Sequence, residues 1–363
     1  MPDPVFTLMI EPVKACDLAC RYCYADNHWK NPMDLDILGT ALARVCAYLD
    51  QTGHTEVHII WHGGEPLMAG IEFYRQSLSL ISSSFPDIPL RQFIQTNGLL
   101  LDREFCLFLK KNNFEVGISL DGPKEIHDAL RIQKTGAPTW AKVMEKLDLM
   151  ADLDLFFGIC MTFTNRSLNR EKTIFDFFTS LGRPLRINPL IPSRRNKNKN
   201  LLPSSGDYGR FLCRIFDRWI RTENRRIPIS PLDTYLSAIS QGGAPECRHR
   251  PSCIGNHLGI RPNGEAVLCS PFDVLILGSI LEHPVSELYE SSACTRIRGR
   301  PKSIPECILC ENKPVCHGGC PQFASAFGGA IDDKDPLCRD YKLIFSHIRK
   351  ALASLETGIP AHG

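Results

Sequence analysis

The stretch that decides the fold runs Cys16-Asp17-Leu18-Ala19-Cys20-Arg21-Tyr22-Cys23. Its three cysteines have the spacing C-x3-C-x2-C and follow an apolar run at residues 6–12 that predicts a buried strand. Thiolates are ligands that suit iron–sulfur clusters. Three thiolates hold three irons of a four-iron cube, so the fourth iron keeps an open position. Zinc is the alternative, but a structural zinc site takes four protein ligands and no fourth one is obvious nearby.

Apart from its cysteines, the composition is that of an ordinary globular protein. The 363 residues carry a formal net charge of +2, which predicts neither nucleic-acid nor membrane-surface binding. No run of about 18 apolar residues predicts a membrane span, and the first residues do not resemble a signal peptide. Sixteen cysteines in such a chain indicate metal binding rather than a secreted disulfide scaffold. We therefore expect a cytoplasmic, metal-binding protein.

Strand and helix patterns alternate through the first half of the chain. After the run at residues 6–12, strands are predicted at residues 57–61, 92–95, 114–120, 155–163 and 185–190. Helices are predicted at residues 35–49, 73–81, 103–111, 140–150 and 173–181. Such alternation predicts a parallel sheet with right-handed crossovers, either an open six-stranded barrel or a doubly wound sheet. Active residues are expected just after the carboxyl ends of its strands.

The chain is predicted to divide into four parts: residues 1–195 as the barrel, 196–244 as a linker with bridging helices, 245–341 as a cysteine-rich domain, and 342–363 as a terminal helix and tail. The third part is rich in Gly and Pro, as expected where metal rather than an apolar core holds a segment together. The polar run at residues 193–200 predicts a solvated loop, with a basic lip at the substrate entrance as the alternative.

The first cysteine motif, with Tyr22 before its third cysteine, resembles the signature of the radical S-adenosylmethionine (SAM) superfamily. The resemblance implies a partial (β/α)6 TIM-like barrel whose cluster binds SAM and yields a 5′-deoxyadenosyl radical. A second segment, after the second predicted strand, resembles the superfamily motif whose backbone binds the SAM amino group. It reads His62, Gly63, Gly64, Glu65, Pro66.

The same resemblance implies further SAM contacts. Ser119 would bond the ribose, Arg131 would meet the carboxylate, and Leu190 and Tyr22 would touch the adenine. The alternatives are a surface ion pair for Arg131 and core packing for Leu190 and Tyr22. Residues 95–98 and 117–123 resemble the peptide-modifying branch of the superfamily, which includes the anaerobic sulfatase maturases.

A second set of cysteines fills the C-terminal third, and its spacing resembles the SPASM domain. The resemblance implies two auxiliary clusters, and hence three [4Fe-4S] clusters in all. The expected ligands of the first are Cys247, Cys253, Cys269 and Cys320. Those of the second are Cys307, Cys310, Cys316 and Cys338. Disulfides or two zinc sites are the alternatives. The five other cysteines are expected to be structural.

Two departures from the sulfatase maturases shape the functional prediction. Those enzymes place an aspartate base after the third ligand of the first auxiliary cluster and commonly a Gln before the two glycines; this chain has Ser270 and His62. We therefore expect a maturase of a ribosomally made peptide (a RiPP maturase), which crosslinks or otherwise oxidises its substrate. Asp273 would be a displaced base, or alternatively a turn-capping loop residue. A sulfatase maturase making formylglycine, or an electron carrier without SAM chemistry, are the alternatives.

The predicted partners follow from this chemistry. They are a peptide or protein substrate and a reductant such as flavodoxin or ferredoxin. The sequence leaves no room for a winged-helix peptide-recognition domain, so a leader peptide would bind the barrel–SPASM surface or a separate protein.

Overall fold

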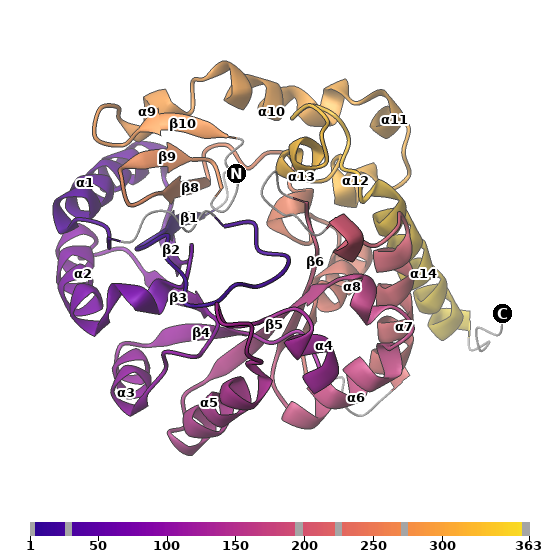
Figure 1. The fold of residues 1–363 in the computed structure, drawn as a ribbon. Helices are drawn as coiled ribbons and strands as arrows, with labels where there is room; N and C mark the ends of the chain where they lie inside the picture. The colour runs from indigo at the N-terminus through magenta and orange to yellow at the C-terminus, as the bar shows by residue number, and fades with distance from the viewer. Residues whose placement is uncertain (1–3, 26–30, 193–198, 222–226, 270–274, 358–363) are drawn as a thin grey trace.

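The computed structural model describes residues 4–25, 31–192, 199–221, 227–269 and 275–357 (Figure 1). Ten strands form one sheet in the order β10-β9-β8-β1-β2-β3-β4-β5-β6-β7. The six predicted strands are its parallel centre: β1 (Val5–Ile10), β2 (Glu56–Trp61), β3 (Leu90–Thr96), β4 (Phe114–Ser119), β5 (Phe157–Phe163) and β6 (Leu185–Pro189). Their order follows the sequence without reversal. The sheet is therefore the open-barrel kind, and the doubly wound alternative is wrong.

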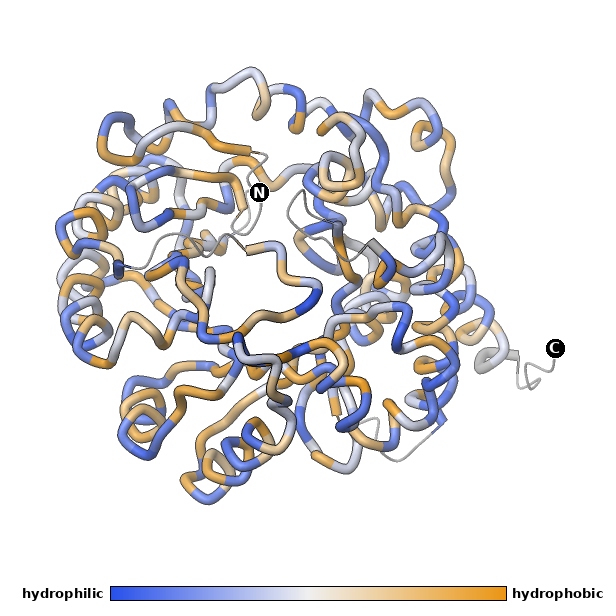
Figure 2. Tube along the Cα trace, in the orientation of Figure 1, coloured by the Kyte–Doolittle hydropathy of each residue, from blue (hydrophilic) through white to orange (hydrophobic). Residues whose placement is uncertain are grey.

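Helices line the outer side of this curved sheet (Figure 1). They are α1 (Leu35–Thr52), α2 (Ile71–Ser84), α3 (Arg103–Lys111), α5 (Trp140–Asp152) and α6 (Glu171–Leu181), with the short α4 (Lys124–Asp128) between β4 and α5. Hydrophilic and hydrophobic residues alternate along these helices, as expected of helices with one buried face (Figure 2). In α1 the Asp34 carboxylate caps the backbone N–H of Asp36, and Gly53 ends the helix in the left-handed conformation.

The alternation along each strand separates the core from the barrel interior. In β1 the side chains of Phe6, Leu8 and Ile10 are buried, and those between them are partly exposed. Because helices cover one face of the sheet, the partly exposed set faces the interior. The parallel register aligns the carboxyl ends of the strands at one edge, where Ile10 lies beside Trp61.

The cysteine-rich segment extends the barrel sheet. β8 (His257–Ile260) pairs parallel with β1, followed by the antiparallel β9 (Glu265–Val267) and β10 (Ile276–Ser279). At the other edge, β7 (Ile229–Ser230) from the bridging segment pairs with β6. No strand was predicted after residue 190. Strands this short leave no period that sequence reasoning can detect.

The remaining helices bridge and close the molecule. They are α7 (Asp207–Arg221), α8 (Leu232–Gln241), α9 (Val285–Leu288), α10 (Ser292–Ser303), α11 (Pro305–Ile308), α12 (Lys313–Cys316), α13 (Pro321–Ala326) and α14 (Cys338–Thr357). The polar run lies outside the described residues up to position 198, and a short 3-10 helix at Lys199–Leu201 ends it. In the described part of the chain no helix is long and apolar enough to cross a membrane.

The contact between α7 and α14 ties the last helix to the barrel. The buried Asp340 carboxylate of α14 accepts hydrogen bonds from the backbone N–H groups of Gly206 (3.1 Å) and Gly209 (2.8 Å). A Cβ atom on Gly209 would lie 2.6 Å from the backbone oxygen of Asp340, so the two helices approach at a position that only glycine allows.

We expect Gly209→Ala to destabilise the protein by about 1–3 kcal/mol, because the added methyl must push two helix backbones apart. The matched control is Gly39→Ala in α1, where an added Cβ meets nothing within 4 Å. That change removes a helix-interior glycine, so stability should hold or rise by about 1 kcal/mol. Thermal unfolding of the anaerobically purified variants measures both. Equal midpoints for the two variants would contradict the close packing.

Candidate active site and cluster-binding cysteines

The loop that carries Cys16, Cys20 and Cys23 crosses the middle of the ring of strands (Figure 1). Backbone hydrogen bonds hold it from two sides. Gly64 and Glu65 donate to the carbonyls of Val13 (3.2 Å) and Ala15 (2.8 Å). On the other side, residues 19 and 21 donate to the carbonyls of residues 132 and 130, both at 2.8 Å. Main-chain hydrogen bonds on both sides of the loop thereby help to fix the positions of the three thiols.

The two glycines after β2 allow this close approach. A Cβ on Gly64 would lie 2.2 Å from the carbonyl oxygen of Ala15, and Gly63 has φ +130°, a conformation that other residues rarely adopt. The N–H of Gly63 donates to Nδ1 of His62 at 2.7 Å. All three N–H groups of residues 63–65 are therefore used, whereas no hydrogen bond to the carbonyl oxygens of Gly63 or Gly64 is found among the described residues. These two carbonyl oxygens can therefore accept hydrogen bonds from the ammonium group of a ligand.

Glu65 links the ends of two strands. Its buried carboxylate accepts from Thr96 Oγ1 (2.6 Å) and from the backbone N–H groups of Asn97 (2.8 Å) and Leu67 (3.1 Å). Burial raises the pKa of this carboxyl to about 7, against the pull of these hydrogen bonds. Asn97 in turn donates to Asp17 in the cysteine loop at 2.7 Å. The side chain of Glu65 thus carries a structural role that the motif alone did not indicate.

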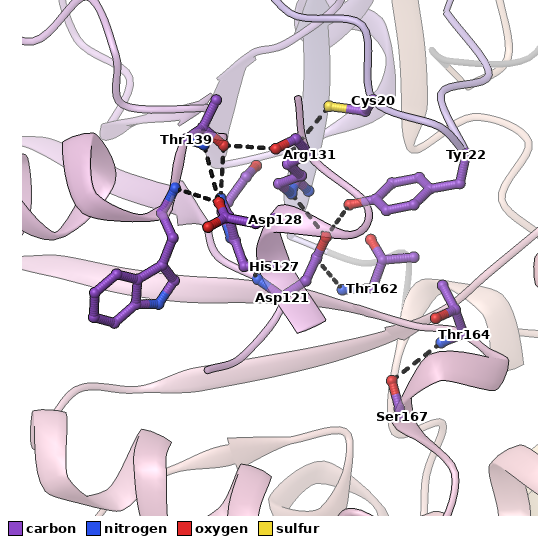
Figure 3. Close-up of polar contacts among 12 residues, drawn as sticks. Cys20, Tyr22, Asp121, His127, Asp128, Arg131, Thr139, Thr162, Thr164 and Ser167 are labelled. Carbon is purple, nitrogen blue, oxygen red and sulfur yellow. Dashed lines mark hydrogen bonds and ion pairs between the residues drawn. The ribbon is translucent and has the colours of Figure 1, made fainter. Parts of the chain in front are cut away.

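Asp121 organises the opposite side of the loop (Figure 3). Its fully buried carboxylate accepts from the Tyr22 hydroxyl (2.6 Å), Arg131 Nε (2.9 Å) and the backbone N–H of Thr162 (2.9 Å). Arg131 also lies over the Tyr22 ring and places Nη1 at 3.9 Å from Cys20 Sγ. The pair is buried, so the alternative of a surface ion pair for Arg131 is wrong. Sequence reasoning missed Asp121, which precedes Gly-Pro and resembles an ordinary turn residue.

A second set of hydrogen bonds fixes the segment that supplies Arg131 (Figure 3). His127 accepts through Nδ1 from the N–H of Asp121 (3.3 Å), and its Nε2 lies 2.9 Å from Thr139 Oγ1. The Thr139 hydroxyl donates to the Arg131 carbonyl at 2.8 Å. Burial lowers the pKa of His127 to about 4, so the ring is neutral at pH 7 and its Nε2 carries the proton.

The other predicted SAM contacts lie around the same opening. Ser119 ends β4, and its hydroxyl accepts from Gln95 Nε2 at 3.0 Å. Leu190 follows β6 and is buried, with its N–H donating to the carbonyl of Phe163. His62 is enclosed after β2, and burial lowers its pKa to about 4.

The structure brings the first set of auxiliary cysteines together. Burial raises the pKa of the Cys269 thiol, and the neighbouring thiols of Cys247, Cys320 and Cys253 raise it further. The four come from distant places: a 3-10 helix at Cys247–His249, the loop after it, the end of β9 and the residue before α13.

The second set lines one pocket. Cys307, Cys310, Cys316 and Cys338 all form its wall. They come from α11, the following turn, α12 and the first residue of α14. Both groupings match the pairing that the resemblance implied.

The spacing of these thiols tests the alternatives to iron–sulfur clusters. All sixteen cysteines lie in the described part of the chain, and none is paired in a disulfide. In a zinc site the sulfurs are ~3.8 Å apart, because each Zn–S bond is about 2.3 Å long. Among the described residues, no three Cys, His, Asp or Glu side chains are close enough to share one metal ion. The preference for iron–sulfur clusters over zinc rests on the resemblance of the two cysteine motifs to known families.

Comparisons with known proteins agree with this geometry. The radical SAM superfamily model matches residues 10–177, and the iron–sulfur cluster-binding SPASM model matches residues 247–312. The serine-type anaerobic sulfatase-maturating enzyme of Klebsiella aerogenes is 30% identical over 355 residues, which cover 94% of this chain and 85% of that enzyme. The chain belongs to the anaerobic sulfatase-maturating enzyme family.

Other members of this family match along the whole chain. The cysteine-type enzyme of Clostridium perfringens is 27% identical, covering 98% of this chain and 100% of the relative. The solved structure of native anSMEcpe with bound AdoMet and Cp18Cys peptide superposes with a TM-score of 0.86 at 26% identity, covering 98% of this chain and 100% of that one. SuiB of Streptococcus suis, at 16% identity and a TM-score of 0.64, shares the fold.

Family membership corrects the main functional prediction. The expectation of a RiPP maturase is wrong, because the near-full-length relatives are sulfatase-maturating enzymes. That expectation rested on Ser270 and His62, two single positions. A change at one proton-transferring position leaves the barrel and the cysteine sets intact, so it does not define the family. The separate leader-peptide-binding protein was predicted only for a RiPP maturase, so that prediction is no longer supported.

The two sets of functional residues meet at Tyr24, which sequence reasoning overlooked. Burial raises the pKa of this hydroxyl, and the negative groups of Cys23, Glu11 and Cys269 raise it further. Tyr24 is therefore within electrostatic reach of both Cys23 of the first motif and Cys269 of the first auxiliary set. Ser270 and Asp273, which follow Cys269, lie outside the described residues, so the role of Asp273 stays a prediction.

We expect Asp121→Asn to cost about 3 kcal/mol or more, since it leaves the Arg131 guanidinium buried without a countercharge. The matched control is Glu104→Gln, which removes a carboxylate from the exposed pair with Arg75 and should cost below about 1 kcal/mol. Anaerobic urea unfolding followed by tryptophan fluorescence compares the two. Similar losses in both variants would show that the Asp121–Arg131 pair is not what holds this side of the loop.

Proposed function

We propose that this chain is an anaerobic sulfatase maturase that oxidises a Cys or Ser side chain of a sulfatase-type peptide to formylglycine. Its similarity to such enzymes along nearly the whole chain carries the proposal. The two cysteine sets also come from adjacent strands of one sheet, because β1 leads to the first cysteine loop and β8 leads through β9 to Cys269.

The enzyme uses SAM and iron–sulfur clusters, as its radical SAM and SPASM domains imply. We assign three [4Fe-4S] clusters, one to Cys16, Cys20 and Cys23 and two to the auxiliary sets. When bound, SAM and the first cluster supply the 5′-deoxyadenosyl radical that removes a hydrogen atom. The residues present fit these groups, because the first set offers three thiols and each auxiliary set offers four.

The chain's own residues would hold SAM in the following way. The free carbonyls of Gly63 and Gly64 would accept from its amino group. Arg131 is oriented by Asp121 beside Cys20 and would bind its carboxylate. Ser119 and Leu190 would meet the ribose and the adenine, and Tyr22 would support Arg131 from beneath its guanidinium plane.

Oxidation of the substrate side chain also requires a proton acceptor. A hydroxyl becomes an aldehyde by losing a hydrogen atom from carbon, a proton from oxygen and one further electron. A thiol becomes a thioaldehyde by the same losses, and water then replaces the sulfur, which leaves as hydrogen sulfide. Ser270 is a poor acceptor without a partner, so we keep Asp273 as the predicted base. The cytoplasm, as a reducing compartment, stays the expected location.

We expect the reconstituted enzyme, given SAM and a reductant, to form an aldehyde on a sulfatase-type peptide bearing Cys, and more slowly on the same peptide bearing Ser. A thiol has a pKa near ~8.5 and loses its proton far more readily than a hydroxyl, which matters where the base is weak. Mass spectrometry of the peptides and chromatography of 5′-deoxyadenosine provide the measurement.

Cys16→Ala is the control and should abolish both products. Abundant 5′-deoxyadenosine with no aldehyde on either peptide would refute sulfatase maturation while leaving the radical chemistry intact. No 5′-deoxyadenosine from a fully loaded enzyme would refute the radical SAM assignment itself.

A further inference from the structure

The second auxiliary set lies beneath a surface that combines lysines with exposed apolar side chains. α11 and α12, which carry two of its cysteines, are at the outer rim of the molecule (Figure 1). Besides the four thiols, the pocket wall includes Lys313, Lys334 and Lys342. Three cationic side chains therefore surround one cluster-binding pocket.

In the part of the chain that the structure describes, two of these three lysines have no ion-pair partner, and the third has one. Lys313 and Lys342 have no ion-pair partner among the described residues, and Lys334 pairs with Glu306 at 2.8 Å. The carboxylate of Asp335 is buried and accepts a hydrogen bond from the backbone N–H of Cys320 at 2.8 Å, so it is not exposed on this surface.

An exposed apolar turn lies between two of the cysteines. Ile308 is 52% exposed and Leu309 is 96% exposed, and both stand between Cys307 and Cys310. Single exposed leucines are common on protein surfaces. Here the exposed pair occupies the two positions between Cys307 and Cys310, which line the same pocket as the three lysines. An apolar centre with a charged rim is the usual anatomy of a protein–protein contact.

We propose that Ile308, Leu309, Lys313, Lys334 and Lys342 form a docking surface for an acidic electron-carrier protein. The proposal rests on the proposed function, because making an aldehyde requires one electron to leave besides the hydrogen atom. The oxidised flavin or iron–sulfur group of the carrier takes up that electron and is reduced by one. A partner of opposite charge would be steered to this face, and the apolar turn would exclude water at the shortest approach to the pocket.

The charge reversal Lys313→Glu/Lys342→Glu tests the surface. Binding of oxidised flavodoxin, an acidic carrier, to the cluster-loaded enzyme is measured by isothermal titration at low and high salt. We expect the wild-type affinity to fall with salt and the double variant to bind about tenfold or more weakly at low salt. Leu309→Ser should weaken binding without changing its salt dependence.

Lys111→Glu/Lys142→Glu is the matched control. It makes the same change of net charge at exposed positions of α3 and α5, far from α11 and α12 in Figure 1. Iron content and visible absorbance confirm that each variant keeps its clusters. Equal binding by wild type and the pocket variant, equal losses in both double variants, or no binding to wild type at low salt would overturn the proposal.

This outcome is separable from that of the proposed function. Selective loss of flavodoxin binding in the pocket variant would support the docking surface even if no sulfatase-type peptide yielded an aldehyde.

Discussion

Backbone hydrogen bonds between the cysteine loop and its two neighbours are the constraint on which the site depends. Residues 13–15 lie against Gly63 and Gly64, and residues 19–21 lie against residues 130–132. A loop of three thiols would otherwise be free to bind metal in many arrangements. Because main-chain bonds hold the loop at both sides, and the Tyr22 and Asp17 side chains add further bonds, the three thiols remain available for a cofactor. The same contacts make the carboxyl edge of the barrel a single preformed site.

The attachment of β8 to β1 extends this constraint to the auxiliary cysteines. β1 leads into the first cysteine loop, and β8 leads through β9 to Cys269. Both therefore take their positions from one pair of strands, which places Tyr24 and Cys269 in the same electrostatic neighbourhood. The second auxiliary set is tied differently, through α14 and its contact with α7. One set thus lies at the barrel interior and the other beneath the outer surface.

Sequence periodicity within single elements was sufficient to predict most of the fold. The period of α1, with Asp34 before it and Gly53 after it, was sufficient to place that helix, and the six central strands followed from alternation. Long-range contacts were not accessible in this way. Asp121 is recognisable as the partner of Tyr22 and Arg131 only once β4 and the cysteine loop are side by side. The strands β8 to β10 are too short to leave a pattern. The functional error had the same origin, because Ser270 and His62 were weighed singly, whereas family membership is a property of the whole chain.

The most direct test of the central claim follows the hydrogen atom. A sulfatase-type peptide whose target cysteine carries two deuterium atoms on Cβ is incubated with the loaded enzyme, SAM and a reductant, and the 5′-deoxyadenosine is analysed by mass spectrometry. The account predicts that one deuterium appears in 5′-deoxyadenosine for each aldehyde formed. Deuterium-free 5′-deoxyadenosine together with a peptide that keeps both labels would contradict it.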